Sequence, residues 1–232
     1  MSLFLALVAA GSFAPLPENS KLLPKRQVRL LVADFGDCMV KREARLASQA
    51  ILANEPGNLM RQYPRLVQDS CIPIQGSESV EVTFSGNQYR YAIAEALVRR
   101  ELAALPAPSF DDLPPLPHGP DRVAPSTDRQ GRLLSGNKLE SAMSDYRSWQ
   151  ASRYMWRFGE CVARVDPAAS RQLLMASPES AEEAASFAAL GTALGTCLGE
   201  GRKIELGKAD LRGTIAVNYY RLAHAALRSE RK

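Results

Sequence analysis

Histidine is scarce in this 232-residue chain, which contains only His118 and His224. Histidine is the usual proton carrier in catalysis near neutral pH, and neither of these two lies in a serine or cysteine nucleophile motif. The sequence also lacks the G-x-S-x-G and H-E-x-x-H motifs, a glycine-rich phosphate loop and a dinucleotide-binding fingerprint. No linear motif therefore indicates a reaction, and we expect no cofactor.

Long hydrophobic runs and an excess of one charge are missing as well. The apolar run at residues 3–10 is far shorter than the roughly 20 residues that span a bilayer, so we expect no transmembrane anchor. The net charge of +4 is too small to drive nucleic-acid binding by itself, and we expect no such partner. With 46% hydrophobic and 23% charged residues, the composition is globular, which excludes wholesale disorder.

The first 14 residues carry no charged side chain. Their apolar run, LFLALVAA, is followed by small residues and then by Pro15 and Pro17. This pattern is typical of a secretory signal peptide, so we predict a signal peptide at residues 1–14 and a periplasmic or secreted mature protein. No Lys or Arg precedes the run, which leaves two alternatives: a start site assigned too far downstream, or a short apolar tail that docks on the core.

The four cysteines are Cys38, Cys71, Cys161 and Cys197. None belongs to a C-x-x-C pair, and with only two histidines a mixed Cys/His metal site would need unusual spacing, so we expect no metal. An even number of cysteines in an exported protein favours disulfide bonds. The alternative is four reduced thiols in a cytosolic protein.

An internal repeat relates the two halves of the chain. Residues 35–41, FGDCMVK, match residues 158–164, FGECVAR, at an offset of 123. Residues 49–53 match 172–176 at the same offset, and residues 89–94 match 211–216 at an offset of 122. Blocks that recur in one order indicate a duplication. Only the pairs Cys38–Cys71 and Cys161–Cys197 would give both copies the same disulfide.

The predicted fold is all-α, with at most one short strand pairing, and comprises two homologous, disulfide-stapled four-helix units. We place unit 1 at residues 21–104, a proline-rich linker at 105–134 and unit 2 at 135–230. Apolar residues at helical spacing predict the helices. Asp166 with Pro167, and Ser180 with Glu183, are the capping signals that begin two of them. They span residues 27–42, 44–53, 59–70 and 88–104 in unit 1, and 138–165, 168–176, 181–197 and 208–228 in unit 2. Pro64 can kink or shorten the helix at 59–70. Residues 80–84 and 203–206 are the candidate strands.

Several polar residues recur in both copies. Asp37 matches Glu160, and Arg90 matches Arg212; Lys41 with Arg164 and Arg99 with Arg221 are further pairs. One interpretation is a pair of ligand sites in which the arginines hold anions. The other is structural, with each arginine bonded to an acid or to helix carbonyls. We favour the structural interpretation, because duplicated halves preserve structure more readily than chemistry.

These observations predict an exported, non-enzymatic binding protein or cell-envelope component, whose ligand and partner the sequence does not identify. The alternative is an exported hydrolase with a site between the two repeats, and a third class is a cytosolic helical regulator. A pocket between the copies discriminates the first two: convergent acids favour the enzyme, and an apolar groove favours the binding protein.

Overall fold

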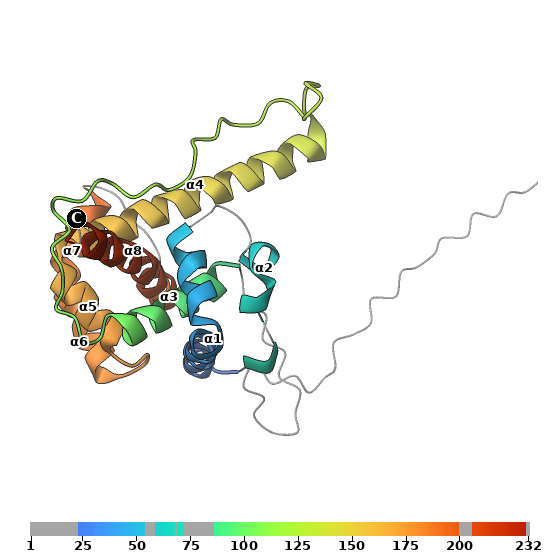
Figure 1. Cartoon of the computed structure of the whole chain (residues 1–232). Coiled ribbons are helices and arrows are strands. Elements are labelled where there is room, and N and C mark those ends of the chain that lie inside the picture. The colour runs from blue at the N-terminus through green and yellow to red at the C-terminus, as the bar shows by residue number, and fades with distance from the viewer. Residues whose placement is uncertain (1–22, 54–58, 68, 72–85, 200–205, 231–232) are drawn as a thin grey trace, which may run out of the picture.

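The computed structural model describes residues 23–53, 59–67, 69–71, 86–199 and 206–230, and every regular element among them is a helix (Figure 1). Outside the helices, the described residues form one isolated antiparallel bridge, Thr127 to Leu133, and no strand. The all-helical prediction is therefore confirmed. The predicted signal peptide and nearly all of the two candidate strands lie outside the described residues.

Four long helices build the core: α1 (Lys25–Ala53), α3 (Gly86–Glu101), α4 (Gly136–Val165) and α8 (Lys208–Ser229). α3 contacts both α1 and α8, and α8 in turn contacts α4, so these helices pack in the order α1, α3, α8, α4 (Figure 1). α8 is buried on almost all sides from Arg212 to Ala223, as expected of a central helix. No helix in the described part of the chain is long and apolar enough to cross a membrane.

α1 covers two of the predicted helices. Glu43, the residue between them, has the non-helical angles φ −130° and ψ 39°, so α1 is kinked at the predicted boundary. The predicted helix at residues 59–70 is wrong. It is replaced by α2 (Leu59–Gln62) and the 3₁₀ turns η1 (Pro64–Leu66) and η2 (Asp69–Cys71), because Pro64 has no N–H to continue a helix.

Capping residues determine where two short helices of the second half begin. Asp166 accepts a hydrogen bond from the Ala169 N–H at 2.8 Å and begins α5 (Pro167–Met175). Ser180 accepts one from the Glu183 N–H at 3.1 Å and begins α6 (Ala181–Ala189).

The prediction of one helix over 181–197 is wrong, because α6 ends at Ala189 and α7 (Gly191–Leu198) begins after Leu190. Leu190 is fully buried with φ −74° and ψ −3°, so its side chain anchors this turn in the core.

Two glycines allow the long helices to approach closely. A Cβ on Gly36 of α1 would lie 2.3 Å from the Ala92 carbonyl oxygen on α3. A Cβ on Gly159 of α4 would lie 2.7 Å from the Thr214 carbonyl oxygen on α8. Both glycines therefore stand where backbone meets backbone, and no other residue fits there without movement.

The disulfide pairing is confirmed. Cys38 bonds Cys71, with Cα atoms 5.6 Å apart, and Cys161 bonds Cys197, with Cα atoms 5.7 Å apart. None of the four cysteines is free. The first bond ties α1 to η2, and the second ties α4 to α7.

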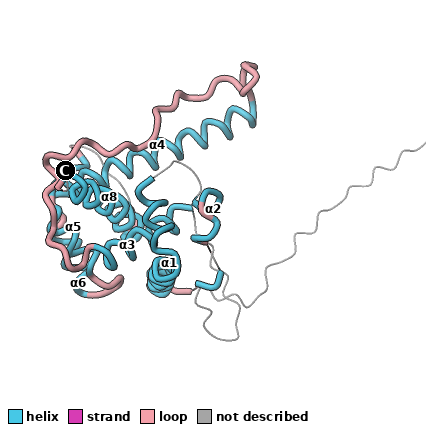
Figure 2. The backbone as a smooth tube through the Cα atoms, in the orientation of Figure 1, coloured by secondary structure: helices cyan, strands magenta, loops and turns pink. Residues whose placement is uncertain are grey.

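The chain between α3 and α4 lies along the protein surface as an extended loop, which Figure 2 shows running beside α4. Phe110 in this loop is only 1% exposed. Its ring packs edge-on against Tyr219 of α8, with ring centroids 5.4 Å apart. The loop thus contributes a side chain to the core.

Candidate functional site

Arg212 on α8 lies at the centre of a buried ion cluster. It is 1% exposed, and its Nε donates to Glu95 of α3 at 2.7 Å while Nη1 donates to Glu183 of α6 at 2.9 Å. Its Nη2 donates to the carbonyl oxygens of Leu174 and Ala176, at 3.3 and 2.7 Å, where α5 ends. One guanidinium therefore joins three helices, and its buried charge is matched by two carboxylates.

Arg29 of α1 extends the cluster. It donates to both carboxylate oxygens of Glu183, at 2.6 and 3.0 Å, and also to Glu179. Burial opposes ionisation of Glu183, but the hydrogen bonds from Arg29 and the Glu179 N–H, with the charges of Arg29 and Arg212, outweigh it and lower its pKa. Burial also opposes the charge on Arg29, yet its two acids raise its pKa. The Glu183 carboxylate is therefore held ionised.

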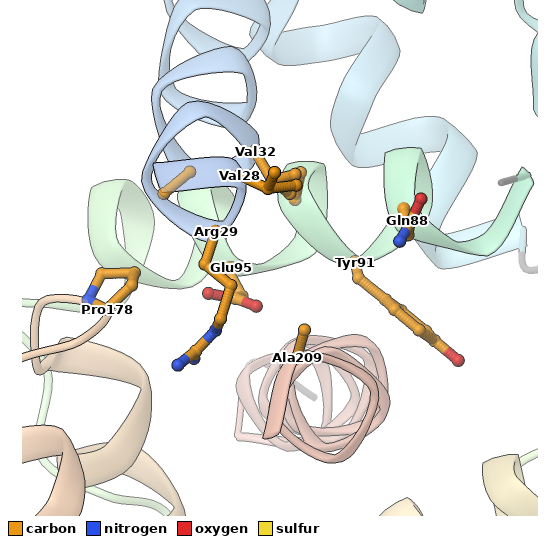
Figure 3. Close-up of a pocket in the computed structure, with 10 residues that line it drawn as sticks. Val28, Arg29, Val32, Gln88, Tyr91, Glu95, Pro178 and Ala209 are labelled. Carbon is orange, nitrogen blue, oxygen red and sulfur yellow. The ribbon is translucent and has the colours of Figure 1, made fainter. Parts of the chain in front are cut away.

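A small pocket of about 60 Å³ adjoins this cluster (Figure 3). It is lined by Val28, Arg29, Val32 and Ala33 of α1, by Gln88, Tyr91, Ala92 and Glu95 of α3, and by Pro178 and Ala209. Figure 3 shows Pro178 and Tyr91 on opposite sides of the pocket, with Arg29 and Glu95 between them. Most of the lining is apolar, and its two charged residues are members of the ion cluster.

Glu160 of α4 is buried beneath the loop. Its carboxylate accepts from the Leu116 N–H at 2.9 Å and from Arg164 Nε at 2.8 Å, and it lies 2.5 Å from Nε2 of His118. Burial opposes ionisation of Glu160, but the hydrogen bonds from His118, Leu116 and Arg164 prevail and lower its pKa. His118 is only 7% exposed, so this contact is shielded from solvent.

Arginines hold the backbone of the same loop segment, residues 110–118, which we call the strap. Arg164 donates through Nη1 to the carbonyl oxygen of Phe110 at 2.7 Å and through Nη2 to that of Pro114 at 2.7 Å. Arg221 of α8 donates to the carbonyl oxygen of Pro117 at 3.0 Å. Burial lowers the pKa of Arg221 to about 10, so it keeps its charge at neutral pH. The strap is therefore held mainly through its carbonyl groups.

Asp37 and Lys41, which match Glu160 and Arg164, lie on the surface of the first half. Asp37 accepts from Arg99 at 2.7 Å, and its side chain is 57% exposed, whereas the side chain of Glu160 is 9% exposed. Asp37, Val40 and Lys41 of α1 line a cleft of about 270 Å³ together with Ala96 and Arg100 of α3. We call this surface the α1–α3 cleft.

The structure does not bring the four predicted polar candidates into one site. Asp37 lies at the α1–α3 cleft, Glu160 lies under the strap, and Arg212 lies in the ion cluster. Arg90 is 2% exposed, and burial lowers its pKa. Sequence reasoning missed Arg29, Glu95 and the contact of His118 with Glu160. Arg212, one of the predicted candidates, was the sequence signal that pointed to the cluster, and Glu183 was visible only as part of a capping signal.

No protein-family model, curated protein or solved structure matches this chain. No group of three or more His, Cys, Asp or Glu side chains in the described ranges could hold a metal ion. The described residues present four features that bear on function: an ion cluster of paired charges, a small apolar pocket, a helix face covered by the strap, and the α1–α3 cleft.

Proposed function

We propose that this chain is an exported, non-enzymatic binding protein built from two homologous helical units. The proposal rests on the ion cluster that lies between the two halves, in which every acid is paired with an arginine. Glu95, Glu179 and Glu183 each bond an arginine, and the lowered pKa of Glu183 keeps that carboxylate ionised. A hydrolase at this pocket would need a carboxyl group able to exchange a proton near neutral pH.

Matched contacts support the duplication on which the proposal draws. Gly36 packs on Ala92, and Gly159 packs on Thr214; these glycines match in the repeat, and so do their two partners. Tyr91 and Gly213, a further matched pair, contact each other, since a Cβ on Gly213 would lie 2.2 Å from Tyr91. Equivalent positions meet where two equivalent units are related by a two-fold axis.

Two disulfides support export. Disulfide bonds persist in the periplasm and outside the cell, whereas the cytosol keeps thiols reduced. The observed bonds close segments with sequence separations of 33 and 36 residues. The loop-entropy model gives each roughly 3–4 kcal/mol of stabilisation, which is lost if the cysteines are reduced.

Cell fractionation tests export. The untagged chain, expressed from its own start, is expected in the periplasm or the medium, shortened at a position between Ala10 and Pro15, with all four cysteines inert to alkylation until reduced. Mass spectrometry of the fractionated protein measures all three properties. An intact chain beginning at Met1 with reactive thiols in the cytoplasm would refute the export proposal.

A further inference from the structure

Two matched helix faces differ in what covers them. In the second half, Glu160 and Arg164 of α4 and Arg221 of α8 lie beneath the strap and bond it. In the first half, the matched Asp37 and Lys41 lie on the surface of α1. Among the described residues, only side chains of α1 and α3 line the α1–α3 cleft.

The strap shows what such a face holds. It contains Pro114, Pro115 and Pro117, so it is extended and short of N–H donors. Its carbonyl groups accept from Arg164 and Arg221, as described above. An extended proline-containing chain suits this recognition, because its exposed carbonyl oxygens need donors and little conformational entropy is lost when it binds.

The α1–α3 cleft presents corresponding groups. Lys41 stands at the position of Arg164, and Arg99 at that of Arg221. Val40 and Ala96, 1% and 2% exposed, form an apolar floor, and Arg100 donates to the Val40 carbonyl oxygen at 2.6 Å. Arg99 pairs with Asp37, the acid of the cleft, and with Glu95, so the charges of Lys41 and Arg100 favour carbonyl oxygens and acidic side chains over a basic ligand.

We propose that the α1–α3 cleft binds an extended, proline-containing segment of a partner protein, as the matched face of α4 and α8 holds the strap. This inference rests on the proposed binding function and on the duplication. It names the chemistry of the partner: a chain with exposed carbonyl groups at prolines and an acidic residue to meet Lys41 and Arg100.

A peptide with the sequence of residues 108–120, PSFDDLPPLPHGP, is the probe. It combines the prolines of the strap with the acids Asp111 and Asp112. A fluorescent form, titrated into the full oxidised protein, is expected to bind saturably by anisotropy. A second form carries a photoreactive benzoyl group on the phenylalanine, and mass spectrometry is expected to locate its cross-links on α1 and α3 around the cleft.

Charge reversal identifies the site. Lys41→Glu with Arg100→Glu is expected to weaken peptide binding by at least about tenfold, because both cations are removed and opposing charges are added. Lys41→Arg restores the residue found in the second half and is expected to keep binding. Arg147→Glu, on the exposed surface of α4, is the matched control and is expected to have no effect. Helical circular dichroism checks that all variants fold.

Four results would overturn the inference. One is the absence of saturable binding up to about 1 mM peptide. A second is binding that survives Lys41→Glu with Arg100→Glu. A third is cross-links on α4 and α8, which would show that the peptide replaces the strap. The fourth is a cross-link between two copies of the chain through this cleft, which would assign it to self-association. Cell fractionation tests export separately, so a failure of the peptide-binding inference can be distinguished from a failure of the export proposal.

Discussion

At the scale of single residues, helix packing in this molecule depends on the absence of a side chain. Gly159 lets α4 touch the backbone of α8 at Thr214, and Gly36 does the same for α1 and α3. Gly195 of α7 differs, because a Cβ there would have nothing within 4 Å. Gly159 is therefore expected to be sensitive to substitution and Gly195 to tolerate it, so the two glycines make a matched pair for mutation.

Gly159→Ala is expected to lower the free energy of unfolding by about 1–3 kcal/mol, because the new methyl group forces α4 and α8 apart. Gly195→Ala is expected to leave it unchanged or raise it by up to about 1 kcal/mol, since alanine restricts the unfolded chain. Urea denaturation followed by circular dichroism measures both. Equal effects of the two substitutions would contradict the close contact at Gly159.

At the scale of elements, each disulfide ties a long helix to a short one. The bond from Cys161 to Cys197 holds α7 against α4. Replacing both cysteines by serine, which leaves no lone thiol, is expected to cost about 2–5 kcal/mol through the greater freedom of the unfolded chain. Thermal unfolding measures the loss. Under a strong reductant the parent and this variant should come closer in stability, and an unchanged gap would contradict the assignment.

The contact of the strap with Glu160 is expected to make the free energy of unfolding depend on pH. Since the pKa of Glu160 is lowered in the fold from its ordinary 4.5, its ionised form stabilises the protein above that pH. This contribution is lost as the pH falls through the lower, folded pKa. Glu160→Gln is therefore expected to cost about 1–3 kcal/mol near pH 7, with the difference from the parent shrinking toward pH 3. Unfolding curves across this range test the sign.

Asp128→Asn is the control for that measurement. Asp128 bonds Arg132 within the exposed loop, so removing its charge should change stability at neutral pH far less than Glu160→Gln does. Protease cleavage within residues 110–118 should also become faster in Glu160→Gln, because the strap loses its carboxylate anchor. A gap that widens toward acid pH would contradict the buried, ionised state of Glu160.

At the scale of the whole molecule, one contiguous core and one ion cluster join the two halves. Buried residues of α1, α3, α4, α5 and α8 form a single hydrophobic cluster. Arg212 bonds Glu95 from the first half, and Arg29 bonds Glu183 from the second. The halves are therefore expected to stabilise each other across α3 and α8.

Arg212→Met is expected to lower the free energy of unfolding by about 3–5 kcal/mol, because it leaves Glu95 and Glu183 with fewer partners in a buried site. The loss should appear in one transition that near- and far-ultraviolet circular dichroism report together. Arg132→Met, which breaks an exposed ion pair, should cost less than about 1 kcal/mol. A small effect at Arg212 would mean that the cluster does not hold the halves together.

The sequence by itself determined features that depend on neighbouring residues or on the repeat. Asp166 with Pro167 marked the start of α5, because a cap acts within one turn. The repeat selected the disulfide pairs, since only Cys38–Cys71 and Cys161–Cys197 give both copies the same bond. Predictions for residues 59–70 and 181–197 failed, because Pro64 and the buried turn at Leu190 break the helices there.

Only the tertiary structure decided which charges meet and which faces are covered. Arg29 and Glu183 are 154 residues apart, and His118 and Glu160 are 42 apart, so no local pattern relates them. The matched Asp37 and Glu160 look alike in the sequence, yet one is exposed and the other is buried under the strap. Burial and pairing depend on segments brought together by packing, so two residues that match in the sequence acquire different environments when a loop covers one of them.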